Sequence, residues 1–269
     1  MGRICIGLLV VTGTFPISVE AAAPFRGGSQ ELIVNALGVV IALILALGYV
    51  IGARGTPVRP WRSWLFSITL VLALFVMLGP LDRLAEVSAA AHMTQHMAII
   101  AVLAPMFALA KPLPQLLVGF GRVGRPVWQW VFKITQYPML CAYLHGVAIW
   151  VWHVPLFYML AVQNSWVHGL AHMCFLISGI WFWWACLYPS ARKIPLALLA
   201  LLLTLMHTGF LGALLTFAAQ PLYSEARHLQ DQQLAGLIMW IIGGFPYLAA
   251  SIWAGARWYN KLQRQIQSI

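Results

Sequence analysis

Seven long apolar stretches dominate this chain, and none of them contains Asp, Glu, Lys or Arg. A helix of about 20 such residues crosses a hydrocarbon core of roughly 30 Å. Because only 8% of all residues are charged, the composition is not that of a water-soluble domain. We therefore expect an all-α polytopic membrane protein with seven transmembrane helices, near residues 32–53, 63–80, 92–110, 134–154, 166–188, 195–218 and 233–254.

The N-terminal residues form a separate segment. Arg3, an apolar run over residues 4–11 and small residues at positions 21–23 are typical of a secretory signal peptide. We predict that residues 1–23 are a cleaved signal peptide and that residues 24–269 form a single seven-helix domain. An eighth helix is the alternative, which the polar residues after the apolar run disfavour.

The charged residues divide between the two sides of this topology. Twelve of the sixteen Lys and Arg residues lie in alternate loops and after the last helix, whereas all six Asp and Glu residues lie on the opposite side. Lys and Arg are retained in the cytoplasmic loops of membrane proteins. We therefore predict that the N-terminus is outside and the C-terminus inside. This asymmetry accounts for the net charge of +10, and the basic loops then face the anionic inner leaflet of the bilayer. No nucleic acid is implied.

The eight histidines are unevenly distributed in this topology. Two lie deep in the apolar stretches, at His145 and His207, and none lies on the cytoplasmic side. The others lie near the outer ends of the helices: His92, His96, His153, His168, His172 and His228. Histidines that merely complete a core have no reason to prefer one end of a bundle. Their clustering therefore indicates a site.

Two pairs of histidines share the spacing i, i+4: His92 with His96, and His168 with His172. Residues four apart stand on one face of a helix, and two imidazoles so placed can bind one metal ion. Capping or interhelical hydrogen bonding explains a single pair equally well. Two pairs at the same depth on different helices favour a metal site.

Methionines beside these histidines indicate which metal is bound. Met93 and Met97 repeat the i, i+4 spacing, and Met206 precedes His207. Thioether sulfur with imidazole suits Cu(I), whereas carboxylate with imidazole suits zinc or iron. From spacing and depth we predict Met93, Met97 and His207 as further copper ligands. Each Met lies about 100° around the helix from its neighbouring His, so packing in the core is the alternative role.

Two aspartates, Asp82 and Asp231, lie just before helix starts on the side of the histidines. Each is placed either to cap a helix or to orient an imidazole. The sequence favours capping for both.

Four separated motifs resemble the CtaG-type membrane factors for cytochrome c oxidase assembly. They are HMTQHM at 92–97, WHVPLFYMLA at 152–161, HGLAHMCF at 168–175 and DQQLAGLIMW at 231–240. The resemblance runs from about residue 30 to the end. It implies a protein of the bacterial inner (plasma) membrane that matures a haem–copper oxidase. It also implies functional positions at His92, His96, His153, His168, His172 and Asp231.

We therefore expect a metallochaperone and not an enzyme. Copper, as Cu(I), would arrive from a periplasmic copper carrier, bind the outer imidazoles and pass to a cytochrome c oxidase subunit. Two alternatives stay open. A zinc-dependent intramembrane hydrolase uses similar HxxxH pairs. A haem b-binding electron carrier needs one His on each of two facing helices, an arrangement that His96 and His172 satisfy.

Overall fold

The computed structural model describes residues 28–121, 126, 129, 133–223 and 228–267, and the regular elements of this part of the chain are all helical. Six helical segments within these residues are long and apolar enough to cross a membrane, and a bent pair of helices makes up to a seventh. The chain is therefore an all-helical, multi-pass membrane protein, as expected. The predicted signal peptide lies outside the described residues.

The second span continues beyond its predicted boundary. After α1 (Ser29–Gly55), α2 (Pro60–Leu78) ends at Gly79 and the short α3 (Pro80–Val87) follows directly. Pro80 interrupts the helix because it has no backbone N–H to donate. The sequence predicted an uncharged span that ends at residue 80. The observed span instead runs to Val87 and includes Asp82 and Glu86 on α3.

The third and last spans share an unusual construction. In the third, a π-helical turn, η1 (Ala98–Leu103), joins α4 (Ala89–Met97) to α5 (Ala104–Ala110). In the last, η3 (Ile238–Ile242) joins α12 (Leu229–Leu237) to α13 (Gly244–Ile266). In a π turn each backbone N–H bonds to the carbonyl five residues earlier. Such turns are rare in proteins, and those that occur are often found at functional sites. Each span therefore changes the face it presents part-way along its length.

The fourth span is broken near one end of the bundle. α8 (Pro138–His153) and α9 (Pro155–Gln163) meet at an angle of 73°. Pro155 favours extended backbone in the residue before it, and Val154 has ψ 131°. The helix predicted over 134–154 begins at Pro138 and ends at His153. After the break, α9 leads directly into α10 (Ser165–Leu187).

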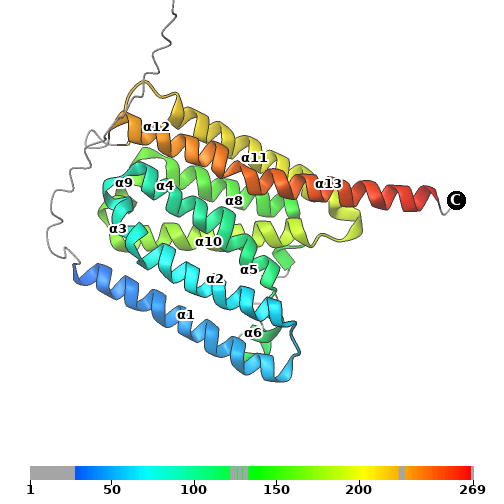
Figure 1. Ribbon diagram of the computed structural model, residues 1–269. Coiled ribbons are helices and arrows are strands. Elements are labelled where there is room, and N and C mark those ends of the chain that lie inside the picture. The colour runs from blue at the N-terminus through cyan, green and yellow to red at the C-terminus, as the bar shows by residue number, and fades with distance from the viewer. Residues whose placement is uncertain (1–27, 122–125, 127–128, 130–132, 224–227, 268–269) are drawn as a thin grey trace, which may run out of the picture.

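Figure 1 shows α1 and α2 along one edge of the bundle and α11 (Ile194–Thr216) with α13 along the other. Between these edges α10 packs against α5, α8 and α9. The short α6 (Leu113–Gly119) lies against α1, and a 3₁₀ turn, η2 (Ala191–Lys193), precedes α11. The core therefore lies around α10, and the exposed apolar side chains of the outer helices suit contact with lipid.

The end of the bundle opposite α3 and α9 carries basic side chains. Lys111 lies over the ring of Tyr188, with its Nζ 3.4 Å from the ring centroid. Lys193 and Lys261 donate to the carbonyls of Gln136 and Ala191. Burial, with Arg62 and Arg257 nearby, lowers the pKa of Lys111. The two ends of the bundle thus differ in charge, as the loop composition predicts.

Candidate metal centre

Caps at two helix starts fix the positions of four histidines. Ser88 begins α4 and accepts a hydrogen bond from the N–H of Ala91 at 3.2 Å. Asn164 begins α10 and accepts from the N–H groups of Trp166 and Val167. Ser and Asn are favoured at this position because they satisfy free N–H groups of the first turn. The caps place both i, i+4 histidine pairs at the same positions, the fourth and eighth residues of α4 and of α10.

The two pairs meet one another and a fifth histidine. Ring centroids lie 4.3 Å apart within the pair on α4 and 4.2 Å apart within the pair on α10. Between the helices, His92 lies 5.2 Å from His168, and His96 lies 5.7 Å from His172. His153, the last residue of α8, lies 5.6 Å from His96. Imidazoles from three helices therefore form one group, which we call the imidazole cluster: His92, His96, His153, His168 and His172.

Two sets of three residues in this region have the spacing of metal ligands. The first set is His92, His96 and His168, and the second is Asp82, His168 and His172. Within each set, one ligand atom from each residue lies within 4.8 Å of the others. Small side-chain rotations would bring such atoms to the roughly 2.0–2.2 Å of a metal bond. His168 belongs to both sets.

Five of the ten ring nitrogens of the cluster are buried without a hydrogen-bond partner among the described residues. Both nitrogens of His96 are buried and unpaired, and so is Nε2 of His153, His168 and His172. Their residues are largely buried, with His96 exposed by only 2% and His172 by 3%. A buried polar group without a partner costs about 1–3 kcal/mol. Several such atoms aimed at one place are typical of a ligand site.

His153 is held in the tautomer that a metal requires. Its Nδ1 lies 2.6 Å from the carbonyl oxygen of Ile149, which can only accept, so Nδ1 carries the proton. The lone pair is therefore on the unpaired Nε2. A backbone carbonyl bonded to the far nitrogen is the usual partner of a metal-binding imidazole.

The two aspartates divide between the roles that the sequence left open. Asp231 accepts hydrogen bonds from Ser88 Oγ at 2.8 Å and from the N–H groups of Ala89 and Ala90. It therefore caps α4, where a negative charge is also favoured by the helix dipole. Asp82 lies 3.8 Å from Nδ1 of His168 and accepts from Nε2 of Gln95 at 2.7 Å. It is therefore directed at an imidazole, against the capping favoured by the sequence.

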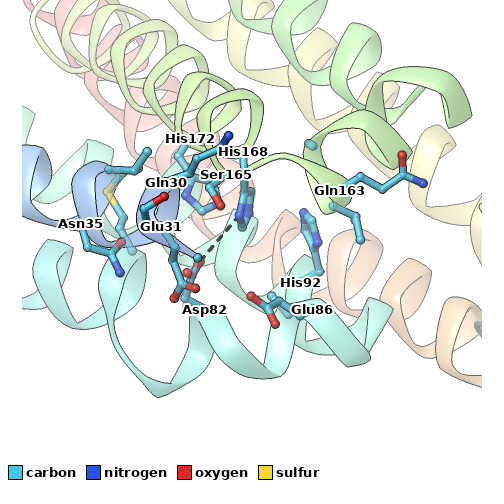
Figure 2. A pocket seen from close by; sticks show the side chains of 17 residues that line it. Gln30, Glu31, Asn35, Asp82, Glu86, His92, Gln163, Ser165, His168 and His172 are labelled. Carbon is cyan, nitrogen blue, oxygen red and sulfur yellow. Dashed lines mark ion pairs between the residues drawn. The ribbon is translucent and has the colours of Figure 1, made fainter. Parts of the chain in front are cut away.

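A cavity of about 610 Å³ opens beside the cluster between the start of α1, α3 and the start of α10. Figure 2 shows His92, His168 and His172 on its wall, with Asp82 joined to His168 by the dashed line. Glu31 and Glu86 also line it. His96 and His153 do not, so they lie behind the histidines that the cavity reaches.

A comparison with known protein families decides which family this is. The family model of the cytochrome c oxidase caa3 assembly factors, Caa3_CtaG, matches residues 41–261. The chain belongs to the Caa3_CtaG family. No curated protein and no solved structure matches the chain. The Caa3_CtaG match covers α4, α8, α9, α10 and α12, so it includes the whole imidazole cluster.

The other residues predicted as ligands have different surroundings in this Caa3_CtaG chain. Met93 and Met97 belong to the apolar core, and the Sδ of Met97 lies against Gly243 in the last span. His207, on α11, accepts a hydrogen bond from Trp150 Nε1 at 3.3 Å. Met206 beside it is 69% exposed. The structure thus brings together the five predicted histidines, whereas Met97 Sδ lies against the last span, His207 bonds to Trp150 and Asp231 caps α4; a ligand role for Met93 stays a prediction.

Two tyrosines that the sequence did not single out border the cluster. The ring of Tyr158, on α9, lies 4.9 Å from His92, and Tyr223 stacks on Tyr158 at 3.8 Å. Tyr223 donates to the carbonyl of His153 at 3.3 Å. Burial, with Tyr158 as a smaller cause, raises the pKa of Tyr223, so its hydroxyl keeps its proton. The motif WHVPLFYMLA contains Tyr158, whereas no sequence signal marks Tyr223.

Proposed function

We propose that this assembly factor takes up copper as Cu(I) from a periplasmic carrier, holds it in the imidazole cluster and passes it to a cytochrome c oxidase subunit. The observation that carries the proposal is the convergence of buried, unpaired imidazole nitrogens from three helices. Imidazole is a ligand for copper. A factor that matures a haem–copper oxidase has copper as its natural cargo.

The number of ligands suits transfer of the ion. The cluster offers five imidazoles, and tetrahedral metal sites in proteins use about four ligands. A spare imidazole can therefore bind the ion before another releases it. Release to the oxidase by the same exchange breaks no covalent bond in the protein. Such a protein is a chaperone and needs no catalytic group.

The cluster belongs on the periplasmic side in this proposal. Basic residues gather at the opposite end of the bundle, and Lys and Arg are retained in the cytoplasm. The cavity beside the cluster then opens toward the periplasm of a bacterial inner membrane. A soluble copper carrier would reach it there.

Replacing single cluster histidines tests the proposal. We expect wild-type protein to purify with copper, and His96→Ala to lower its copper affinity by about 100-fold, which corresponds to about 2.7 kcal/mol, whereas His172→Ala should lower delivery of copper to the oxidase. Cells that carry only these variants should make the oxidase polypeptides but lose oxidase activity. His228→Ala is the matched control, because His228 starts α12 outside the cluster. Normal copper in the oxidase from the His96→Ala cells would contradict the proposal.

One observation supports a second candidate, the zinc-dependent hydrolase. Asp82, His168 and His172 resemble the two imidazoles and one carboxylate of catalytic zinc sites, and Glu86 lines the same cavity as a possible general base. Elemental analysis separates the two candidates. One zinc per chain, with oxidase copper unchanged in His172→Ala cells, would favour hydrolysis.

The haem b alternative fits the cluster poorly. His96 and His172 have ring centroids 5.7 Å apart, and the ring of Phe175 packs against His96 at 4.6 Å. A porphyrin between two axial imidazoles needs a flat slot clear of other side chains. A Soret band in the purified protein would revive this alternative.

A further inference from the structure

We propose that Asp82, His168 and His172 form a loading position, where copper first binds before it moves inward to His92 and His96. The inference rests on the proposed copper function. It starts from the two overlapping ligand sets. The loading set is Asp82, His168 and His172, the inner set is His92, His96 and His168, and the two share only His168. An ion can exchange one set of ligands for the other while it stays bound to the shared imidazole.

The cavity reaches all three residues of the loading position and His92 of the inner set, but not His96. Figure 2 shows Asp82, from α3, directed toward His168 of α10, with His172 beside His168. His172 is 3% exposed, and its Nε2 has no partner among the described residues. His96, in the inner set, does not line the cavity. An ion that enters from the cavity therefore meets the carboxylate-containing set before it can reach His96.

The chemistry of the two sets favours movement inward. The loading set contains a carboxylate oxygen, a hard ligand better matched to zinc, iron or magnesium than to Cu(I). The inner set contains only imidazoles. Copper as Cu(I) should therefore bind more weakly at the loading position than at the inner position. Weak first binding followed by stronger binding inside is what a one-way uptake needs.

The cavity also carries charge that attracts cations. Glu31 and Glu86 line it together with Asp82, and no Lys or Arg is among its described lining residues. A concave surface of one sign raises the local concentration of the opposite charge and speeds association. This effect weakens as salt screens the charges. The rate of copper uptake should therefore depend on salt.

A hydrogen bond fixes Asp82 between the two sets. Nε2 of Gln95 donates to Oδ1 of Asp82 at 2.7 Å and to the carbonyl of Val76 at 2.9 Å. Gln95 lies on α4 between His92 and His96, and it is fully buried. The carboxylate is therefore held at the junction of the two sets, pointing at His168.

Uptake kinetics test this inference. Purified full-length protein in detergent would be mixed with Cu(I) as a coloured chelator complex, and the fall in the colour would give both uptake rate and equilibrium affinity. For Asp82→Asn we expect uptake about tenfold slower, with equilibrium affinity changed by less than about threefold. For His96→Gln we expect the opposite: fast initial uptake and an affinity lower by about 100-fold. Asp82→Glu, which keeps the carboxylate, should restore part of the rate.

A second pair of variants keeps the test decisive if Asp82→Asn fails to fold. Glu31→Gln with Glu86→Gln should slow uptake and remove most of its salt dependence, whereas Gln163→Ala, a neutral change in the same cavity, should do neither. Wild-type uptake rates in Asp82→Asn and in the double variant would overturn the loading position. Equal losses of rate and affinity in Asp82→Asn would also overturn it, because Asp82 would then be a ligand of one single site. Absence of copper binding by the wild type would instead refute the proposed function itself.

Discussion

Two buried histidines of this bundle, His145 and His96, differ in whether their ring nitrogens have hydrogen-bond partners. His145, on α8, is 0% exposed, and its nitrogens lie 3.0 Å from Ser178 Oγ and 3.3 Å from Tyr247 Oη. Its ring also stacks on Phe182 at 5.3 Å. His96 is 2% exposed and neither of its nitrogens has a hydrogen-bond partner among the described residues.

The contrast separates a structural histidine from one that suits a ligand. The polar groups around His145 satisfy one another, which is the ordinary state of buried polar atoms. Around His96 the polar neighbours are the rings of other cluster histidines. Several ring nitrogens of the imidazole cluster are therefore left without a hydrogen-bond partner among the described residues. Depth in the membrane therefore says less about function than the completeness of the hydrogen bonding.

The largest effect on stability should come from His145. Replacing it with Leu leaves Ser178 and Tyr247 without their partner, and a lost buried network of this kind costs about 2 kcal/mol. We expect His145→Leu to lower the free energy of unfolding in detergent micelles by about that amount. Copper affinity, measured on the folded fraction, should stay within about twofold of wild type. A large loss of copper affinity would erase the distinction between the two histidines.

A smaller effect of opposite sign should come from His96. In the absence of copper, His96→Leu removes two unpaired buried nitrogens and keeps a side chain of similar size. We expect the copper-free variant to be more stable than wild type by about 1 kcal/mol. Unfolding of both proteins in the presence of a copper chelator measures this. Destabilisation by His96→Leu would mean that its nitrogens have partners in the folded protein.

The smallest effect should come from Asp231, which lies near the cluster but caps α4. Asp231→Asn keeps one acceptor for the backbone and loses the charge at the helix start, which is worth about 0.5–1 kcal/mol. We expect a loss of stability in that range and unchanged copper affinity. Thermal unfolding and a copper titration of the same sample measure both. A drop in copper affinity as large as that of His96→Ala would restore Asp231 as a ligand.

Hydropathy and the spacing of the histidines were enough to predict most of the fold and the histidines that form the imidazole cluster. The spans follow from apolar runs long enough to cross a membrane, and the meeting of the two i, i+4 pairs follows from their equal depth. The roles of Asp82 and Asp231 could not be predicted, because both lie just before a predicted span and only tertiary contacts distinguish them. Nor could the surroundings of Met97, because a residue next to a cluster histidine points about 100° away around the helix.

Other features left no trace in an apolar pattern. A π turn differs from an α-helix by one residue per turn, and runs such as Ala98–Leu103 are hydrophobic on all sides. Tyr223 lies in a loop and meets the cluster through the ring of Tyr158 on α9 and the carbonyl of His153 on α8. Pro155 does mark the bend, since proline predicts a helix boundary at the residue before it.

The π turn η1 makes the third span two pieces with separate registers. Before the turn, α4 presents His92 and His96 to α10, while within the turn the carbonyl of Ile100 accepts a hydrogen bond from Trp183 of α10 at 2.8 Å. Removing one residue from this turn would restore an ordinary helix and rotate the upper piece by about 100°. Both imidazoles would then swing away from their partners while the lower packing stayed in place. The arrangement of the proposed copper site thus depends on a single surplus residue in an otherwise featureless hydrophobic run.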